Sequence, residues 1–350
     1  MMRSFIRLIR RGMEATDKVL CRLALSTRLT ASLYYLLANP RFFREQQAVL
    51  AGRVRFAQAG RAASDPTLRR NIHRLEKGLL MRPRKAVFAT DYIRETVELY
   101  CRLSRLETAD PGEINWAADV LDEYFAVVGE TDVVRAARAN FAQVRKTKGK
   151  STAPQRVPRP QSQIARAPVE YENFLQLCRQ RRSVRWFIDR PVPKEFIERA
   201  AKAAAEAPSA CNRQPFFFRW FGTRSEASRI ASIAMGTAGY SEQIPGLLVI
   251  LADLSCFAHE RDRHVPYIDG SLAAMQLMLA LETMGLGSCP INWPDIETLE
   301  RCMDQALQLP RHLRPIMLLA VGYPDPQGGV AHSEKKTADR LLLESNYYPY

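Results

Sequence analysis

Residues 207–215 read APSACNRQP and join two segments of different character. The preceding run EFIERAAKAAAE (195–206) is rich in helix-forming residues, whereas the following FFFRWF (216–221) has the aromatic content of a strand. A helix-to-strand connection needs only a cap and a turn, yet two prolines frame and stiffen this one. The loop also carries short polar side chains that can hydrogen-bond the edge of a heteroaromatic ring: Ser209, Asn212 and Gln214. A capped turn without a ligand would explain the same residues, so the loop alone leaves both interpretations open.

The rest of the C-terminal half mixes helix and strand patterns. Helix patterns cover 171–183 and a segment that begins after Pro193. Strand patterns follow at 247–251 and 315–321, and a very apolar helix is predicted at 272–284, buried nearly all round in a core or across a subunit interface. Because there are few strands and no regular β-α alternation, the sequence predicts an α+β fold rather than a doubly wound sheet.

The N-terminal half reads as helical throughout. Helical periodicity runs from residue 5 to about 56, with a break where Pro40 can only begin a new helix. A second group starts at 66 and is predicted to stop at Gly78, in a C-terminal cap position, before helical patterns resume. The next segment has many prolines and cations and no periodicity, which is typical of a linker. We therefore predict a basic helical region (1–145), a linker (146–168) and a C-terminal domain (169–350).

The net charge of +14 is concentrated in the first half of the chain. Up to Ala167 there are 31 Lys and Arg against 16 Asp and Glu, whereas from Pro168 onward there are 20 against 21. A basic half joined to a neutral half suggests that the first half meets an anionic partner, such as a phosphate, an acidic polymer or an anionic lipid. A merely solvated basic surface is the alternative.

Cysteine usage and hydropathy indicate in which cellular compartment the protein resides. The seven cysteines are scattered, odd in number and never spaced Cys-x-x-Cys, so neither a disulfide scaffold nor a zinc site is indicated, and a reducing cytoplasm fits best. No apolar run approaches the roughly 18 residues that a membrane span requires. The start of the chain, residues 1–29, reads as a basic amphipathic helix that either packs on its own domain or lies on anionic lipid at the inner face of the membrane.

The segment RRSVRWF at 181–187 gathers cationic donors at a predicted helix end. Arginine forks together with a serine hydroxyl suit a phosphate and a planar polar edge. The donors are Arg181, Arg182, Ser183 and Arg185. A surface arginine cluster without a ligand is the alternative.

Two later segments could complete a site. GLGSC at 285–289 ends the apolar helix with Gly285 and Gly287, and glycine permits positive φ and close approach of the backbone to a ligand. The third glycine of a dinucleotide motif is absent. VGYPDP at 321–326 precedes a tail whose cations could close a phosphate site or remain solvated: Lys335, Lys336 and Arg340.

Together, these segments make 179–324 resemble the nitroreductase family of FMN-dependent oxidoreductases. RRSVRWF, APSACNRQP, GLGSCPINW and VGYP occur in the family's order and at its usual intervals, over roughly half of the chain. The resemblance implies a nitroreductase-like sandwich, in which a mainly antiparallel sheet is flanked by helices. It also implies a homodimer with intertwined helices, which suits the apolar helix at 272–284.

The resemblance assigns FMN contacts to the arginine-rich segment. Arg181 would contact the phosphate, and Arg182 with Ser183 the phosphate or the ribityl chain. Arg185 would face the N1/C2 carbonyl end of the isoalloxazine, where a fixed cation favours the reduced, negatively charged form.

The other motifs receive roles in the same way. Pro208 and Ser209 would lie beside the flavin of the other subunit, with Asn212 on the ring's polar edge and Gln214 nearby. The loop at 287–291 would bring a backbone donor to flavin N5; it consists of Gly287, Ser288, Cys289, Pro290 and Ile291. The terminal phosphate contact would fall to Lys335 or Lys336 with Arg340, at a spacing longer than the family's.

The implied reaction is ping-pong, with NAD(P)H as reductant and a small molecule as acceptor. The sequence shows no obvious general acid, so no catalytic residue is assigned. Cys211 and Cys289 lie within the motifs, where small apolar packing is favoured over redox chemistry. Some relatives dehydrogenate, dehalogenate or consume their own flavin, so the acceptor stays open.

The chain departs from the family in carrying about 165 residues before the catalytic motifs. NIHRLEKGLLMRPRKAVF (71–88) is similar to a block in longer nitroreductase-like proteins associated with bacterial capsule or exopolysaccharide biosynthesis. It contains the densest cationic cluster of the chain: His73, Arg74, Lys77, Arg82, Arg84 and Lys85, with Glu76 as an internal partner. This cluster either packs against the catalytic half or binds a phosphorylated or acidic sugar.

A second function is compatible with the same residues. A catalytically weak protein of this fold could bind or assemble an anionic glycan or a membrane surface through its basic half. Nucleic acid is the least favoured partner, since no recognised nucleic-acid-binding module is visible.

Overall fold

The computed structural model describes residues 16–17, 19–58, 64–148 and 155–342. Most of the basic start that we predicted to be an amphipathic helix lies outside these ranges. None of the helices within them is long and apolar enough to cross a bilayer.

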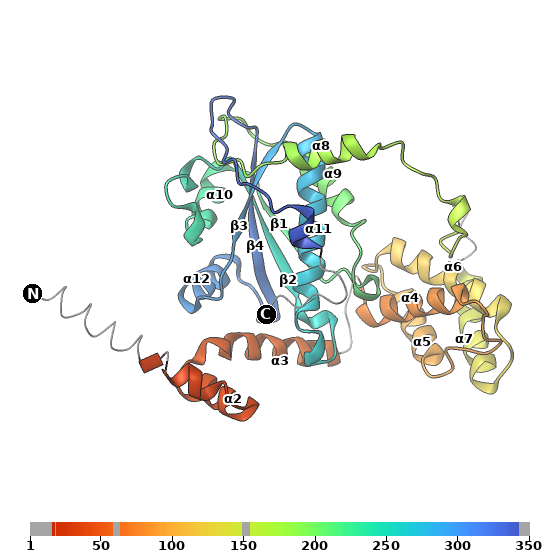
Figure 1. Ribbon diagram of the computed structural model, residues 1–350. Helices are drawn as coiled ribbons and strands as arrows, with labels where there is room; N and C mark the ends of the chain where they lie inside the picture. Colours follow the sequence, from red (N-terminus) through yellow and green to blue (C-terminus); the bar gives the residue numbers. More distant parts are fainter. Residues whose placement is uncertain (1–15, 18, 59–63, 149–154, 343–350) are drawn as a thin grey trace, which may run out of the picture.

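A four-stranded antiparallel sheet forms the centre of the C-terminal half (Figure 1). Its order is β1-β2-β4-β3, with strands β1 (Phe216–Phe221), β2 (Gly246–Asp253), β3 (Gly287–Asn292) and β4 (Leu313–Gly322). The predictions of β1, β2 and β4 are confirmed, as is the α+β fold. The prediction of a loop at 287–291 is wrong, because these residues pair one by one with Gly322 to Leu318 of β4.

Helices cover both faces of the sheet. Successive side chains of β2 point alternately into two separate hydrophobic cores, one on each face. Leu248 and Ile250 pack with α9 (Lys194–Ala204) and α11 (Val265–Thr283). Leu247 and Val249 pack on the other face with α10 (Arg224–Ala231) and α12 (Glu297–Leu307). Alternate residues of a strand point to opposite faces, so an apolar strand that is buried along its whole length serves both cores.

The apolar helix α11 is longer than predicted, because it starts at Val265 with Pro266 in its first turn. It ends at Thr283, and the φ of +74° at Gly285, two residues beyond, confirms the expected left-handed residue. One face is not covered within the chain, since Ile268, Leu272 and Met275 are 57%, 44% and 39% exposed. Burial nearly all round is therefore wrong for a single chain, and the subunit-interface alternative is the one that would cover this stripe.

The helices α4 to α7 form a separate cluster beside the sheet (Figure 1). They are α4 (Pro66–Leu80), α5 (Ile93–Leu103), α6 (Pro111–Val127) and α7 (Asp132–Lys148). Asp65 and Asp110 cap α4 and α6, each followed by proline at the first helical position. The prediction that α4 stops at Gly78 is wrong: the helix continues to Leu80, and glycine is required because a Cβ would lie 2.4 Å from Cε2 of Phe88.

The linker region joins this cluster to the sheet half. Residues 155–170 hold little regular structure apart from a short 3-10 turn at Gln161–Gln163, and α8 (Tyr171–Gln180) follows. The amide of Arg156 donates to Asp119 Oδ2 on α6 at 2.9 Å. The proposed division at 145 and 168 remains a prediction.

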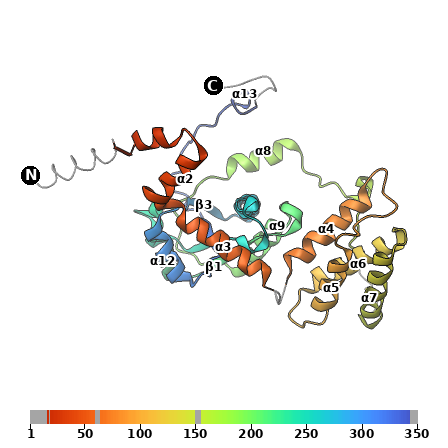
Figure 2. The same ribbon diagram turned by 90° about the horizontal axis from the view of Figure 1, so that it is seen from below.

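The helices α2 (Arg28–Leu37) and α3 (Phe43–Ala57) precede the α4–α7 cluster, and the 3-10 turn at Pro40–Phe42 between them confirms the predicted break. Of the two, α3 lies against the sheet half, beside the 3-10 turn at Leu254–Cys256. Figure 2 shows α3 crossing below the sheet and α11. Arg44 of α3 bonds Glu297 Oε2 and Asp304 Oδ2 of α12 at 2.7 and 2.5 Å. Residues 43–57 thus support the sheet half directly.

Close backbone approach at Gly52 of α3 yields a stability prediction. A Cβ there would lie 2.8 Å from the carbonyl oxygen of Leu254, and backbone cannot give way as a flexible side chain can. We expect Gly52→Ala to destabilise the protein by about 1–3 kcal/mol despite the better helix propensity of alanine. Chemical denaturation measures this, with Val54→Ala on the exposed face of α3 as the control. Equal stability of both variants would contradict the docking of α3.

Candidate functional site

The arginine-rich segment 181–187 is held between β3 and the end of β4. Ser183 forms a bridge with Ser288, and the amide of Val184 donates to the Ser288 carbonyl at 3.0 Å. Further along, Phe187 bridges Pro324. The structure therefore brings the predicted residues of 181–185, 287–291 and the VGYP motif together at one end of the sheet.

Gly287 has a packing role rather than a conformational one. Its φ is not positive, contrary to our expectation. A Cβ at this position would lie 2.8 Å from Cγ of Pro324 and 2.9 Å from Cγ2 of Val184. Glycine is therefore needed for three chain segments to meet here.

Two buried polar atoms at this end of the sheet lack a partner. They are Nε of Arg181 and Oγ of Ser288, and the Ser288 residue is fully buried. Buried polar groups in proteins are nearly always hydrogen-bonded, so such atoms call for a ligand or water. A phosphate or carbonyl oxygen would accept from both, and the residues thus fit an FMN-like group with anionic and carbonyl oxygens.

Positive charge also lies beside Cys289 and Tyr240. Burial raises the pKa of the Cys289 thiol, against the opposing charges of Arg185 and Arg181. Burial and then Cys289 raise the pKa of Tyr240 to about 12, and its hydroxyl lies 3.9 Å from Cys289 Sγ. Both groups are protonated near neutral pH, so Cys289 packs as a neutral side chain in the core of the α10 and α12 face.

The C-terminal tail meets the arginine segment at the His332 carbonyl. Arg182 Nη2 donates to the His332 carbonyl at 2.8 Å, three residues before Lys335. The side chains of Lys335, Lys336 and Arg340 are exposed, and the tail with α13 (Ala338–Leu341) extends away from the sheet in Figure 2. Their assignment to phosphate remains a prediction.

The 207–215 loop has an unusual backbone. Cys211, Asn212 and Gln214 have φ of 54°, 51° and 50°, a region that costs non-glycine residues on the order of 1 kcal/mol each. Such a conformation persists only where its surroundings impose it. Ser209 Oγ accepts from the Gln214 amide at 3.1 Å, and Asp269 Oδ2 accepts from the Ala210 amide at 3.0 Å. Burial raises the pKa of Asp269, and the bond from Ala210 and the charge of Arg213 oppose this rise.

The loop and the arginine segment lie at opposite ends of the sheet. The loop precedes Phe216, which is level with Arg314 at the start of β4, whereas Ser288 is level with Val321 near its end. Seven residues of strand span about 23 Å. One chain therefore does not bring both motifs to the same ring.

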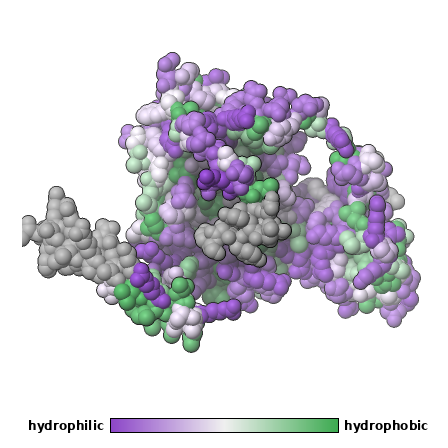
Figure 3. Space-filling view, viewed as in Figure 1, coloured by the Kyte–Doolittle hydropathy of each residue, from purple (hydrophilic) through white to green (hydrophobic). Residues whose placement is uncertain are grey.

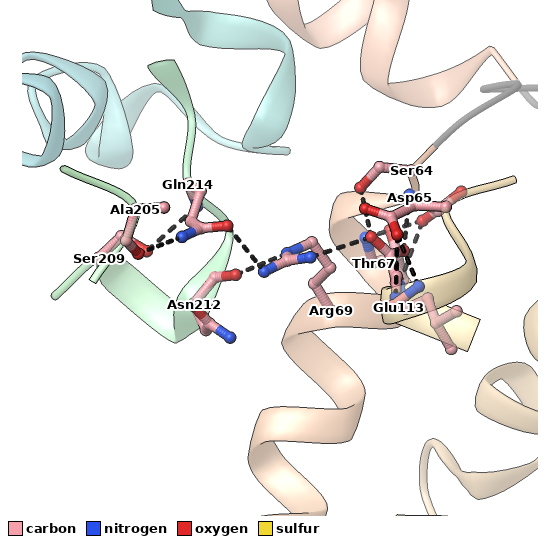
Figure 4. A network of polar contacts seen from close by, with 12 residues as sticks. Ser64, Asp65, Thr67, Arg69, Glu113, Ala205, Ser209, Asn212 and Gln214 are labelled. Carbon is pink, nitrogen blue, oxygen red and sulfur yellow. Dashed lines mark hydrogen bonds and ion pairs between the residues drawn. The ribbon is translucent and has the colours of Figure 1, made fainter. Parts of the chain in front are cut away.

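Sequence reasoning missed a residue that contacts the loop from outside the segment 179–324. Arg69 of α4 donates from Nε to the Asn212 carbonyl at 2.7 Å and from Nη2 to Gln214 Oε1 at 3.1 Å (Figure 4). Its position in a helix pattern carries no signal of this contact, because the partners lie more than 140 residues further along the chain.

Other candidate sites are less suited to a cofactor. A cavity of about 460 Å³ beside α3 is lined by charged groups of both signs, including Arg44, Glu300 and Arg314. It lies near the start of β4, away from the arginine segment. Among the described residues, no group of three His, Cys, Asp or Glu side chains is arranged to hold a metal.

Known proteins match the part of the chain that carries this site. A family model described as "Nitroreductase family" matches residues 178–323. NADH dehydrogenase of Thermus thermophilus is 32% identical over 47% of this chain and 92% of its own length. FMN reductase (NADPH) of Bacillus subtilis is 31% identical over 43% of this chain and 66% of its own. Iodotyrosine deiodinase of Thermotoga neapolitana is 30% identical over 43% of this chain and 87% of its own.

Proposed function

The chain belongs to the nitroreductase family of NAD(P)H-dependent flavin oxidoreductases, and on this premise we propose that it binds FMN and transfers electrons from NAD(P)H to a small-molecule acceptor. Bound FMN would supply two-electron chemistry in a ping-pong reaction. The observation that carries the proposal is the convergence of 181–185, 287–291 and 321–324 around two unpartnered buried donors.

In this proposal the arginine segment holds the cofactor. Arg181, with an unpartnered Nε, binds the phosphate, and Arg182 and Ser183 bind the phosphate or ribityl chain. Arg185 stabilises negative charge at the N1/C2 end of the ring. The backbone of β3 at Gly287 to Ile291 faces the reacting edge, and Lys335 or Lys336 with Arg340 closes the phosphate end.

We further propose a homodimer in which each cofactor lies between two copies. Within one chain the 207–215 loop and the arginine segment are separated by the length of the sheet, so the loop would border the cofactor held by the other copy. Pro208, Ser209, Asn212 and Gln214 would then contribute across the interface. The exposed apolar stripe of α11 supports this arrangement, since exposed contiguous apolar surface is typical of interfaces.

Purification and a spectrum test the proposal. The protein should be yellow, release FMN on acid or heat treatment, and bleach within seconds on addition of NADH or NADPH, followed by recovery when an acceptor is added. A colourless protein that takes up no added FMN at micromolar concentration would contradict it. Nitroaromatic and halogenated phenolic acceptors provide a first panel, because the relatives include an iodotyrosine deiodinase.

We also propose a link to polysaccharide biosynthesis, with a phosphorylated or acidic sugar as the anionic partner of the N-terminal half. The support is the cationic cluster at the end of α4, in which Lys77, Arg82, Arg84 and Lys85 are exposed. Binding to an acidic glycan that weakens steeply with salt would support the link. Unchanged binding after neutralisation of these four side chains would contradict it.

The alternative is a catalytically weak protein that binds an anionic glycan or a membrane surface at the inner face of the cytoplasmic membrane. Figure 3 shows hydrophobic side chains gathered on α2, where Leu29, Leu33, Leu36 and Leu37 are exposed. An apolar helix face that follows a basic stretch of sequence (1–29) suits an anionic lipid surface. Rapid reduction and reoxidation of bound FMN would remove this alternative, and we place the protein in the cytoplasm in either case.

A further inference from the structure

The strained loop 207–215 is fixed from outside the catalytic half. Contacts within that half hold Gln214 through Ser209 Oγ and through its own Nε2, which donates to the Ala205 carbonyl at 2.7 Å. Two further acceptors of the strained stretch, the Asn212 carbonyl and Gln214 Oε1, both receive bonds from Arg69. The side-chain amide of Gln214 is thereby held at both of its polar atoms: Oε1 by Arg69 of α4 and Nε2 by the Ala205 carbonyl at the end of α9 (Figure 4).

Arg69 is itself fixed by the helical cluster. Its Nη1 donates to Glu113 Oε2 at 3.0 Å, and the Glu113 side chain is only 2% exposed. Glu113 also accepts from Ser64 Oγ at 2.5 Å and from the Asp65 amide at 3.0 Å, at the cap of α4. A buried carboxylate requires its cation, so Arg69 cannot swing away from Glu113 without leaving that charge uncompensated.

The geometry of the guanidinium makes these contacts simultaneous. Its planar fork directs Nε and Nη2 at the loop while Nη1 points at Glu113, and the Trp116 ring lies 5.5 Å from its Cζ. A lysine carries one flexible ammonium group and cannot make all three bonds in fixed directions. The Arg69–Glu113 pair therefore fixes where the loop at 207–215 lies, in addition to balancing a buried charge.

We propose that Arg69 is a positioning residue for the cofactor site: through it, the N-terminal helical cluster sets the conformation of the loop at 207–215. This inference rests on the proposed function for the identity of the ligand that the loop borders. The cluster α4–α7 is then part of the scaffold of the redox site, in addition to any partner that its basic surface binds. In the dimer, the helical cluster of one copy would tune the cofactor held by the other.

Two conservative variants separate positioning from general stability. Arg69→Lys keeps a cation beside Glu113 but loses the fork. Arg145→Lys makes the same change at an equally buried arginine, 15% exposed against 14%, that pairs with Asp122 within the helical cluster. We expect Arg69→Lys to raise amide hydrogen exchange across 207–215 about 10-fold or more, with or without FMN, and to slow turnover about 10-fold. Arg145→Lys should change neither.

A second variant decides the matter if Arg69→Lys fails to fold. Arg69→Met combined with Glu113→Gln removes both charges of the buried pair, and we expect the same loosening of the loop and faster release of FMN. Exchange in 207–215 and FMN release within about twofold of the parent protein, in whichever of these variants folds, would overturn the proposal. A parent protein that binds no FMN would instead overturn the proposed function and leave the exchange result standing.

Discussion

The variant in which Arg181 and Arg185 are both replaced by alanine is expected to be colourless after purification, because it retains no FMN. Each lost charge-assisted hydrogen bond costs about 1.5–3 kcal/mol, so the pair weakens FMN binding by on the order of 10² to 10⁴-fold. The orphaned Arg181 Nε and the charge that Arg185 places beside β3 are the structural reasons. Fluorescence titration with FMN measures the change.

The control removes the same charge elsewhere on the catalytic half. Arg229 on α10 and Arg301 on α12 are exposed, and their joint replacement by alanine should leave FMN affinity within about twofold. Full FMN occupancy in the Arg181→Ala, Arg185→Ala chain would show that the arginine segment does not hold the cofactor.

Charge placed on the uncovered face of α11 is expected to separate the proposed dimer. Leu272→Asp with Met275→Asp would bury two unpaired carboxylates in an apolar interface, a cost of several kcal/mol at each of two symmetric positions. Light scattering should then report monomers, and FMN should be lost with them because each site would lack the partner's loop. Leu106→Asp, at a 40% exposed position in the helical half, should change neither property. A monomer that retains FMN would contradict a shared site.

Sequence patterns predicted the parts of the fold that local periodicity records. The strand at β2 and the helix at α11 are apolar enough to be found from hydropathy alone, and the break at Pro40 follows from the missing proline N–H. β3 was missed because glycine and proline in GSCPIN have low strand propensity, and its pairing with β4 is a long-range interaction. At Gly78 the sequence shows a glycine, but only the fold shows that Phe88 occupies the space of a Cβ.

The site was predictable to the extent that its motifs are contiguous. The arginine segment, β3 and VGYP were named from sequence, and the structure places them side by side at one end of the sheet. The contacts of Arg44 on α3 and of Arg69 on α4 were not predictable. Each joins residues more than 140 positions apart, and neither arginine stands in a motif. Helix periodicity shows which face of a helix is polar, but it does not show what that face contacts.

Subunit mixing tests the central claim, an FMN site built from two copies of the chain, most directly. One chain would carry Arg181→Ala with Arg185→Ala, and the other Ser209→Asp with Asn212→Asp, so that each homodimer lacks one half of both of its sites. After the two are unfolded and refolded together in equal amounts, half of the dimers are mixed, and each mixed dimer holds one intact site. The account predicts recovery of about a quarter of the parent's NAD(P)H-dependent turnover and FMN content. Recovery no greater than the sum of the two separate variants would contradict it.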